Sequence, residues 1–89
     1  MSRVDELRAV LTERFSPQRL DIMDDSAKHA GHAGAREGGH YRVRIVAREF
    51  RGLKRVESHR LVYDALAQMM GRGIHALSID ATAPDKIDE

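Results

Sequence analysis

The 89-residue sequence predicts one small α/β domain, an α-β-β-α-β chain with a three-stranded mixed sheet and both helices on one face. Two segments repeat apolar residues at helical spacing, and three shorter segments have the alternating or apolar pattern of strands. The strand–helix–strand step favours a right-handed crossover between the last two strands. We expect the domain to span residues 1–82 and a short, frayed acidic tail to span residues 83–89.

The first helix is predicted to begin after Ser2. The Ser2 hydroxyl and the Asp5 carboxylate can satisfy free amide groups of a first turn. Apolar residues then follow at helical spacing: Val4, Leu7, Leu11 and Phe15. The pair Ser16-Pro17 ends this helix, because a residue before proline is pushed out of the α region.

Two strands and a long loop are predicted next. Residues 19–24 alternate through Leu20 and Ile22, and residues 40–47 are rich in Val, Ile and Tyr with arginines between them. The intervening residues 25–39 are rich in glycine and alanine and have no apolar period. Consecutive strands can pair antiparallel across this loop, and loops of such length are often functional.

A second helix and a last strand complete the predicted domain. After a turn at residues 50–52, a helical stripe runs over Arg55–Met70, and Gly71 and Gly73 can supply the C-cap. The apolar run over residues 74–79 predicts a short buried strand.

Composition limits the classes of function. The chain has no cysteine, which excludes disulfides and thiolate ligands or nucleophiles. No apolar run approaches the ~20 residues that span a bilayer, and the N-terminus has no signal-peptide core, so we expect a cytoplasmic protein. The sequence contains no nucleophile-elbow, P-loop or dinucleotide-binding motif. These observations favour a binding module over an enzyme.

Charge is unevenly spread along the chain. Residues 36–60 carry eight Lys/Arg against three Asp/Glu, whereas residues 80–89 carry one lysine against four acids. The basic residues flanking the turn before the second helix could bind phosphates without reading base sequence, or could form an ordinary solvated helix start. They are Arg48, Arg51, Lys54, Arg55 and Arg60.

The five histidines are the main candidate ligands. His29, His32 and His40 lie in or at the end of the long loop, His59 on the second helix and His75 in the last strand. Neutral imidazole is the commonest protein metal ligand. No cysteine or carboxylate pattern completes a zinc site, so spacing alone favours solvated residues for the loop histidines and structural residues for His59 and His75.

Several short segments, taken together, resemble the BolA family over roughly the whole chain from the first helix to Pro84. In order they are Asp24-Asp-Ser26, His29, His40-Tyr41, Phe50-Arg-Gly52, His59-Arg-Leu-Val-Tyr63 and Ile74-His-Ala-Leu77. The fold of that family resembles a class II KH domain without its phosphate-binding loop. The family usually has arginine before the helix histidine, where this chain has Ser58.

The resemblance implies a partner and a cofactor. BolA proteins pair with a monothiol glutaredoxin of the CGFS type, and a [2Fe-2S] cluster bridges the two proteins. The glutaredoxin supplies its cysteine and a glutathione thiolate. The BolA side supplies the last-strand histidine, here His75, and a loop residue, here His29 with His32 as runner-up. The isolated protein would be without the cluster, as a monomer or weak dimer, and the role would lie in iron–sulfur assembly, trafficking or iron regulation.

The resemblance also implies an alternative. The family is associated with transcription and stress responses, so a KH-like surface and the five basic residues could form a DNA-binding regulator. The two functions predict different partners, a glutaredoxin in one case and a nucleic acid in the other.

Overall fold

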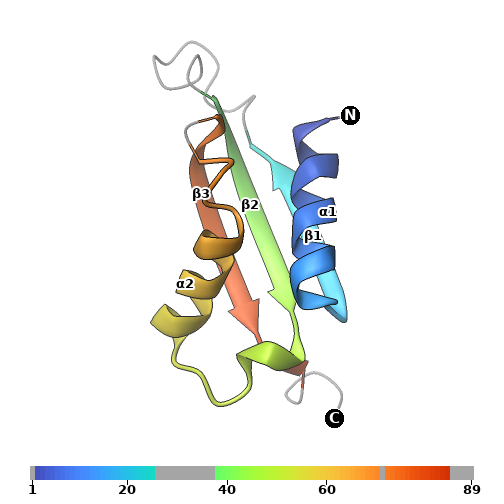
Figure 1. Cartoon of the computed structure of the whole chain (residues 1–89), viewed down its shortest axis with the longest axis vertical. Helices are drawn as coiled ribbons and strands as arrows, with labels where there is room; N and C mark the ends of the chain where they lie inside the picture. Colours follow the sequence, from blue (N-terminus) through green and yellow to red (C-terminus); the bar gives the residue numbers. More distant parts are fainter. Residues whose placement is uncertain (1, 26–37, 71, 85–89) are drawn as a thin grey trace.

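The computed structural model describes residues 2–25, 38–70 and 72–84. Its elements follow the predicted order, with one short 3-10 turn added after the second strand (Figure 1). They are α1 (Arg3–Phe15), β1 (Arg19–Asp24), β2 (Gly38–Val46), η3 (Arg48–Phe50), α2 (Arg55–Ala65) and β3 (Gly73–Thr82). Neither helix in these ranges is long and apolar enough to cross a bilayer.

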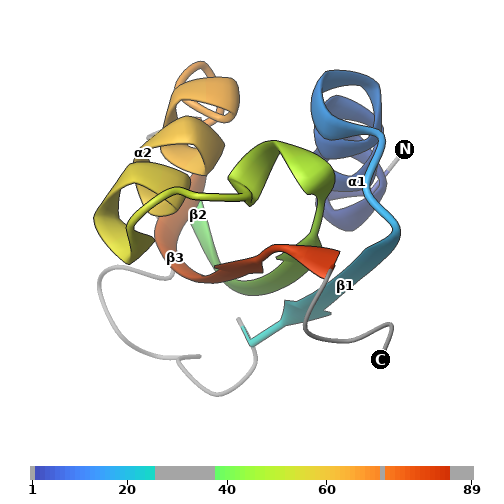
Figure 2. The same ribbon diagram turned by 90° about the horizontal axis from the view of Figure 1, so that it is seen from below.

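β2 is the central strand of the sheet, whose order is β1-β2-β3. β1 pairs with it antiparallel, from Arg19 opposite Val46 to Asp24 opposite Tyr41. β3 pairs with it parallel, so α2 is the crossover between them. Figure 2 shows α1 and α2 on the same face of the sheet. The predicted α/β class, element order and layer arrangement are therefore confirmed.

The core lies between the helices and that face of the sheet. Along β2, Tyr41, Val43 and Ile45 are buried, while the alternating Arg42 and Arg44 are exposed. The helices contribute fully buried side chains to the same cluster, namely Leu7, Leu11, Val62 and Leu66. With both helices on one side, the opposite face of the sheet is left polar.

The end of α1 is joined to η3 by two contacts. Ser16 adopts the left-handed conformation (φ 45°) and ends the helix. The Phe15 and Phe50 rings then pack with centroids 5.2 Å apart. Beside them, a guanidinium nitrogen of Arg14 lies 2.8 Å from a carboxylate oxygen of Glu49. These contacts hold η3, and hence the start of α2, against the first helix.

The second helix is shorter than predicted. α2 ends at Ala65 rather than Met70, because the next residues form tight turns in which the Met69 N–H bonds the carbonyl of Leu66. Met69 stays half-buried in these turns. The apolar pattern of the sequence therefore continues past the point where the helix ends.

The last strand is longer than predicted. β3 continues to Thr82 rather than Ile79, because residues 80–82 keep pairing with residues 44–46 of β2. β2 itself begins two residues earlier than predicted, at Gly38. Beyond β3, Pro84 is fully buried, so the domain packs slightly past residue 82. Residues 85–89 of the predicted acidic tail lie outside the described residues.

Gly73 starts β3 in a conformation that requires glycine. Its φ is +141°, a region that residues with a Cβ rarely adopt. A Cβ built there would also collide with guanidinium atoms of Arg3. Arg3 itself is paired with Glu6 on α1. The backbone at the start of β3 is thus packed directly against the Arg3 side chain of α1.

We expect Gly73→Ala to lower the free energy of unfolding by about 1–3 kcal/mol, as measured by urea denaturation, because alanine strains this φ. Gly52→Ala is the comparator, since Gly52 also has a positive φ (+75°) but nothing within 4 Å of a built Cβ. Most of the Gly73→Ala loss should persist in an Arg3→Ala background. If it disappears there, the contact with Arg3, not the backbone, is what requires glycine.

We expect Glu49→Gln to lower the free energy of unfolding at pH 7 by less than about 1 kcal/mol, because the pair is over one-third exposed and water screens it. The Arg14 guanidinium, mainly through its hydrogen bond, lowers the pKa of Glu49 below its ordinary value. This stabilisation is therefore present above the unfolded-state pKa and is lost as pH falls through the lower folded-state pKa. Urea curves at pH 7 and pH 3 should show the two proteins converging at pH 3.

Candidate functional site

The ends of the long loop meet the start of β3 at one end of the sheet. On one side of the loop, the Asp25 N–H donates to the His40 carbonyl over 2.7 Å. On the other side, Gly38 is paired with Gly73. The backbone therefore brings the loop's two anchors and the first residues of β3 together (Figure 1).

His75 occupies an irregular position in β3. Gly39 is opposite Ile74, but the next residue, His40, is opposite Ala76. The register shift makes His75 the extra residue of a β-bulge, two residues after the constrained Gly73. A bulge interrupts the regular alternation of a strand, and bulges are frequent next to functional sites for that reason.

The other two predicted ligands, His29 and His32, fall outside the described residues. Within the described ranges no group of three or more His, Asp or Glu residues could hold a metal ion. His75 and a loop histidine stay the ligands that the family resemblance predicts for this chain. A metal centre with so few ligands from this chain needs further ligands from another molecule.

The remaining histidines lie elsewhere. His40 is half-buried at the start of β2, and its carbonyl accepts the Asp25 N–H. His59 is half-buried on α2, beside Ser58, which is only 3% exposed. His59 and Ser58 line a hollow of about 650 Å³ between α2 and the end of β3. Ser58 thus sits in the wall of that hollow.

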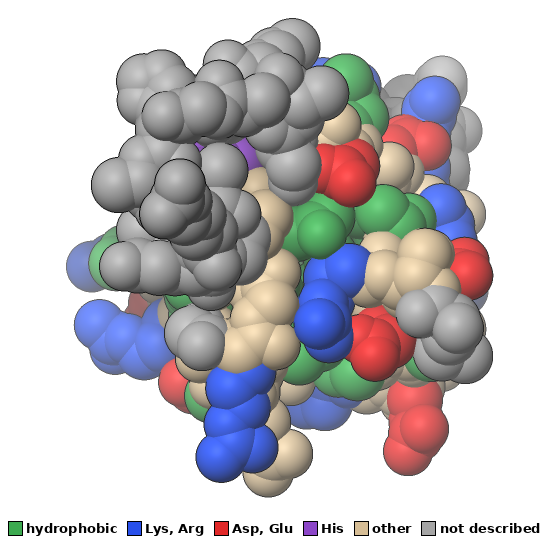
Figure 3. Space-filling model, turned by 90° about the horizontal axis from the view of Figure 1, so that it is seen from above, with side chains coloured by type: hydrophobic (Ala, Val, Ile, Leu, Met, Phe, Trp, Pro, Cys, Tyr) green, Lys and Arg blue, Asp and Glu red, His purple; other side chains and the backbone are tan. Residues whose placement is uncertain are grey.

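The five predicted basic residues are all exposed: Arg48, Arg51, Lys54, Arg55 and Arg60. They belong to η3, the turn after it and α2, and the first four lie at the opposite end of the sheet from the loop (Figure 1). At the loop end, by contrast, Figure 3 shows basic and acidic side chains interspersed with apolar ones on the described surface. His75 and the basic residues around η3 therefore lie at opposite ends of the sheet.

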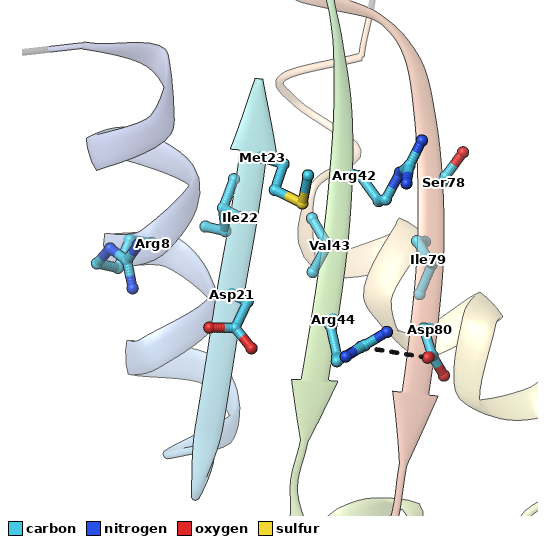
Figure 4. Close-up of a pocket in the computed structure, with 10 residues that line it drawn as sticks. All are labelled: Arg8, Asp21, Ile22, Met23, Arg42, Val43, Arg44, Ser78, Ile79 and Asp80. Atoms are coloured by element: carbon cyan, nitrogen blue, oxygen red, sulfur yellow. Dashed lines mark ion pairs between the residues drawn. The ribbon is translucent and has the colours of Figure 1, made fainter. Parts of the chain in front are cut away.

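The open face of the sheet carries a feature that sequence patterns did not predict. A hollow of about 570 Å³ lies there across all three strands (Figure 4). Arg44 Nε is 3.5 Å from a carboxylate oxygen of Asp80, and a nitrogen of Arg42 is 3.1 Å from one of Asp25. Met23 is 51% exposed beside them. The arginines that alternate along β2 are visible in the sequence. The acids that pair with them could not be identified there, because they lie far from these arginines along the chain.

The sequence and the fold of this chain match those of known proteins. The family model described as BolA-like protein matches residues 11–86. The solved structure of BolA1 from Arabidopsis thaliana has a TM-score of 0.85 and 38% identity, covering 97% of this chain and 96% of that one. The BolA domain of SufE1 from the same plant has a TM-score of 0.86 and 40% identity, with 98% of both chains covered.

Relatives matched by sequence differ in length. The "Uncharacterized protein in cobS 5'region" of Sinorhizobium sp is 38% identical over 94% of this chain and 94% of its own. Protein BOLA1, chloroplastic, of Arabidopsis thaliana is 38% identical over 96% of this chain, but the chain spans only 56% of that protein. The chain spans 25% of SufE-like protein 1 of the same plant. The family match and the relative that agrees over nearly its whole length establish that this chain belongs to the BolA family.

Proposed function

We propose that this protein is an adaptor that pairs with a monothiol CGFS glutaredoxin and shares a [2Fe-2S] cluster with it, in iron–sulfur trafficking or iron regulation. The observation that carries the proposal is His75, the bulged residue of β3, beside the anchors of a loop that holds His29 and His32. BolA proteins are generally regulators or adaptors, which fits a chain without a catalytic motif. A reducing compartment such as the cytoplasm suits this role.

The donor set of this chain fits such a cluster. The chain offers neutral imidazoles and no thiolate. Two imidazoles on one iron are an established mode of [2Fe-2S] ligation, and they raise the reduction potential relative to four thiolates. The glutaredoxin cysteine and the glutathione thiolate would complete the coordination.

In this proposal, different backbone contacts position the two histidine ligands. The ladder between β2 and β3 holds the residues on either side of His75, which are Ile74 and Ala76, and Gly73 allows the chain to turn into that ladder. Asp25 and Gly38 anchor the two ends of the loop that carries the second ligand. One ligand therefore comes from a hydrogen-bonded strand and the other from the loop beside it.

We expect His75→Ala to abolish most of the visible absorbance and circular dichroism of the bridged cluster when the protein is mixed with a cluster-loaded CGFS glutaredoxin. His29→Ala should reduce the same signals strongly, and His32→Ala should reduce them less. His59→Ala is the matched histidine control, since it lies on α2 toward the other end of β3, and it should leave the signals unchanged. Unchanged spectra in both His75→Ala and His29→Ala would contradict the ligand assignment.

A second candidate function is direct DNA binding by a transcriptional regulator. The observation favouring it is that all five residues of the basic set are exposed, four of them clustered around η3 and the first residue of α2. Such a cluster can contact phosphates, which gives affinity without base readout.

We expect duplex DNA binding, if it occurs, to be detectable at ~50 mM salt and to weaken steeply as salt rises, because bound phosphates release counterions. Replacing Arg51, Lys54 and Arg55 by glutamine should lower the slope of log affinity against log salt by about 0.9 for each phosphate that the variant no longer neutralises. Fluorescence anisotropy with a labelled duplex measures both effects. No binding at low salt would exclude this function.

A further inference from the structure

The outer edge of β3 points backbone amide and carbonyl groups away from the sheet. The Thr82 carbonyl accepts from the Ala47 N–H, so even-numbered residues of β3 point their backbone groups toward β2. By alternation, Leu77, Ile79 and Ala81 point theirs away from the sheet. β3 is the last strand in the sheet order, so within the described residues no strand pairs with this edge.

Tyr63 closes one part of this edge and leaves the rest open. Its hydroxyl on α2 donates to the Leu77 carbonyl over 3.0 Å. That contact blocks strand pairing at Leu77, as proteins commonly do at exposed edges. Further along the strand, past Ile79, Ala81 lines the hollow of about 650 Å³ without a comparable cap in the described part of the chain.

The wall of the hollow facing the strand is partly apolar. The backbone stretch 80–83 forms one side, and the turn after β2 contributes Phe50, Gly52 and Leu53. Phe50 is 3% exposed, whereas Leu53 is 37% exposed. We name the outward backbone of Ile79 and Ala81, together with this hollow, the β3-edge groove. An extended chain lying along the groove would place alternate side chains against its apolar wall.

The mouth of the groove is basic. Arg55 lines the hollow and Lys54 precedes it in the chain; both are exposed, and neither has an ion pair among the described residues. Two acids lie near them. Asp80 is paired with Arg44 on the other face of the sheet, whereas Glu57 keeps its charge while a carboxylate oxygen accepts the Lys54 backbone N–H over 2.7 Å. The two cations outnumber this one uncompensated acid, so the balance at the mouth is positive, which complements an acidic occupant.

We propose that the β3-edge groove binds an extended acidic segment of a partner protein by strand addition. The backbone of the segment would exchange hydrogen bonds with Ile79 and Ala81, an apolar side chain would enter the hollow, and flanking acids would face Lys54 and Arg55. Main-chain pairing at a sheet edge with pockets for alternate side chains is an established mode of peptide recognition. Nucleic acid is less favoured, because it offers no matching row of amide and carbonyl groups.

The β3-edge groove is separate from the proposed cluster ligands. His75 lies near the beginning of β3, and Ala81 lies near its end. At 3.2–3.4 Å per residue the two positions are roughly 20 Å apart. Peptide binding can thus be measured without a cluster, and its failure would leave the proposed pairing with a glutaredoxin untouched.

A random decapeptide library displayed on phage provides the test, with the full chain as bait. We expect enriched peptides to be acidic with a central apolar residue, and a lysine-for-acid version of the best peptide to bind at least tenfold more weakly. Hydrogen exchange followed by NMR should show the amides of Ile79 and Ala81 protected at least tenfold in the complex.

Three variants and a nucleic-acid probe complete the test. Ala81→Pro removes an outward N–H without taking a donor from the ladder with β2, and it should weaken peptide binding at least tenfold. Arg55 is exposed, so Arg55→Glu should retain the fold, and it should weaken binding similarly. Arg72→Glu, an exposed arginine before β3, is the charge-matched control and should bind normally. No enriched peptide, no protection of Ile79 and Ala81, or tighter binding of a single-stranded decanucleotide than of the best peptide would each overturn the proposal.

Discussion

The backbone ladder of β2 with both of its neighbours determines where every other element lies. β2 uses one set of amide and carbonyl groups for β1 and the alternate set for β3, as the bonds from Gln18 to Val46 and from Ala47 to Thr82 show. The first pairing is antiparallel, so a loop alone can connect β1 to β2. The second is parallel, so the chain must cross over the sheet, and α2 is that crossover. Both helices then fall on one face, over the buried side of β2.

β3 is a long edge strand that pairs in parallel with β2. Its two ends differ in backbone structure. At the beginning, the positive φ of Gly73 and the bulge at His75 disturb the regular strand. At the end, regular pairing continues through Thr82, and the outward backbone groups face a hollow under α2. A single strand thus presents one irregular end beside the loop and one regular end beside a basic helix start.

Features that depend on local side-chain patterns could be predicted from the sequence, whereas those that depend on distant pairing could not. The alternation of apolar residues with arginines over residues 41–45 predicted which side of β2 is buried. The full length of β3 could not be predicted, because Asp80 and Thr82 pair through their backbone while their polar side chains lie on the open face and break the apolar run. His75 could be named as a candidate from its residue type, the absence of cysteine and the family resemblance. Its bulge depends on the register of β3 against Gly39 and His40, more than thirty residues earlier.

The two proposed binding surfaces lie at opposite ends of β3, so a partner at one end would not compete with a partner at the other. Between the two ends, from Ala76 to Thr82, β3 pairs regularly with the central strand. A strand that is paired on both sides frays less than an edge strand, so an occupant of the outer edge would also restrict the backbone that carries His75. If the two ends are coupled in this way, thermodynamic reciprocity requires that a ligand ordering the His75 end also strengthens binding at the outer edge.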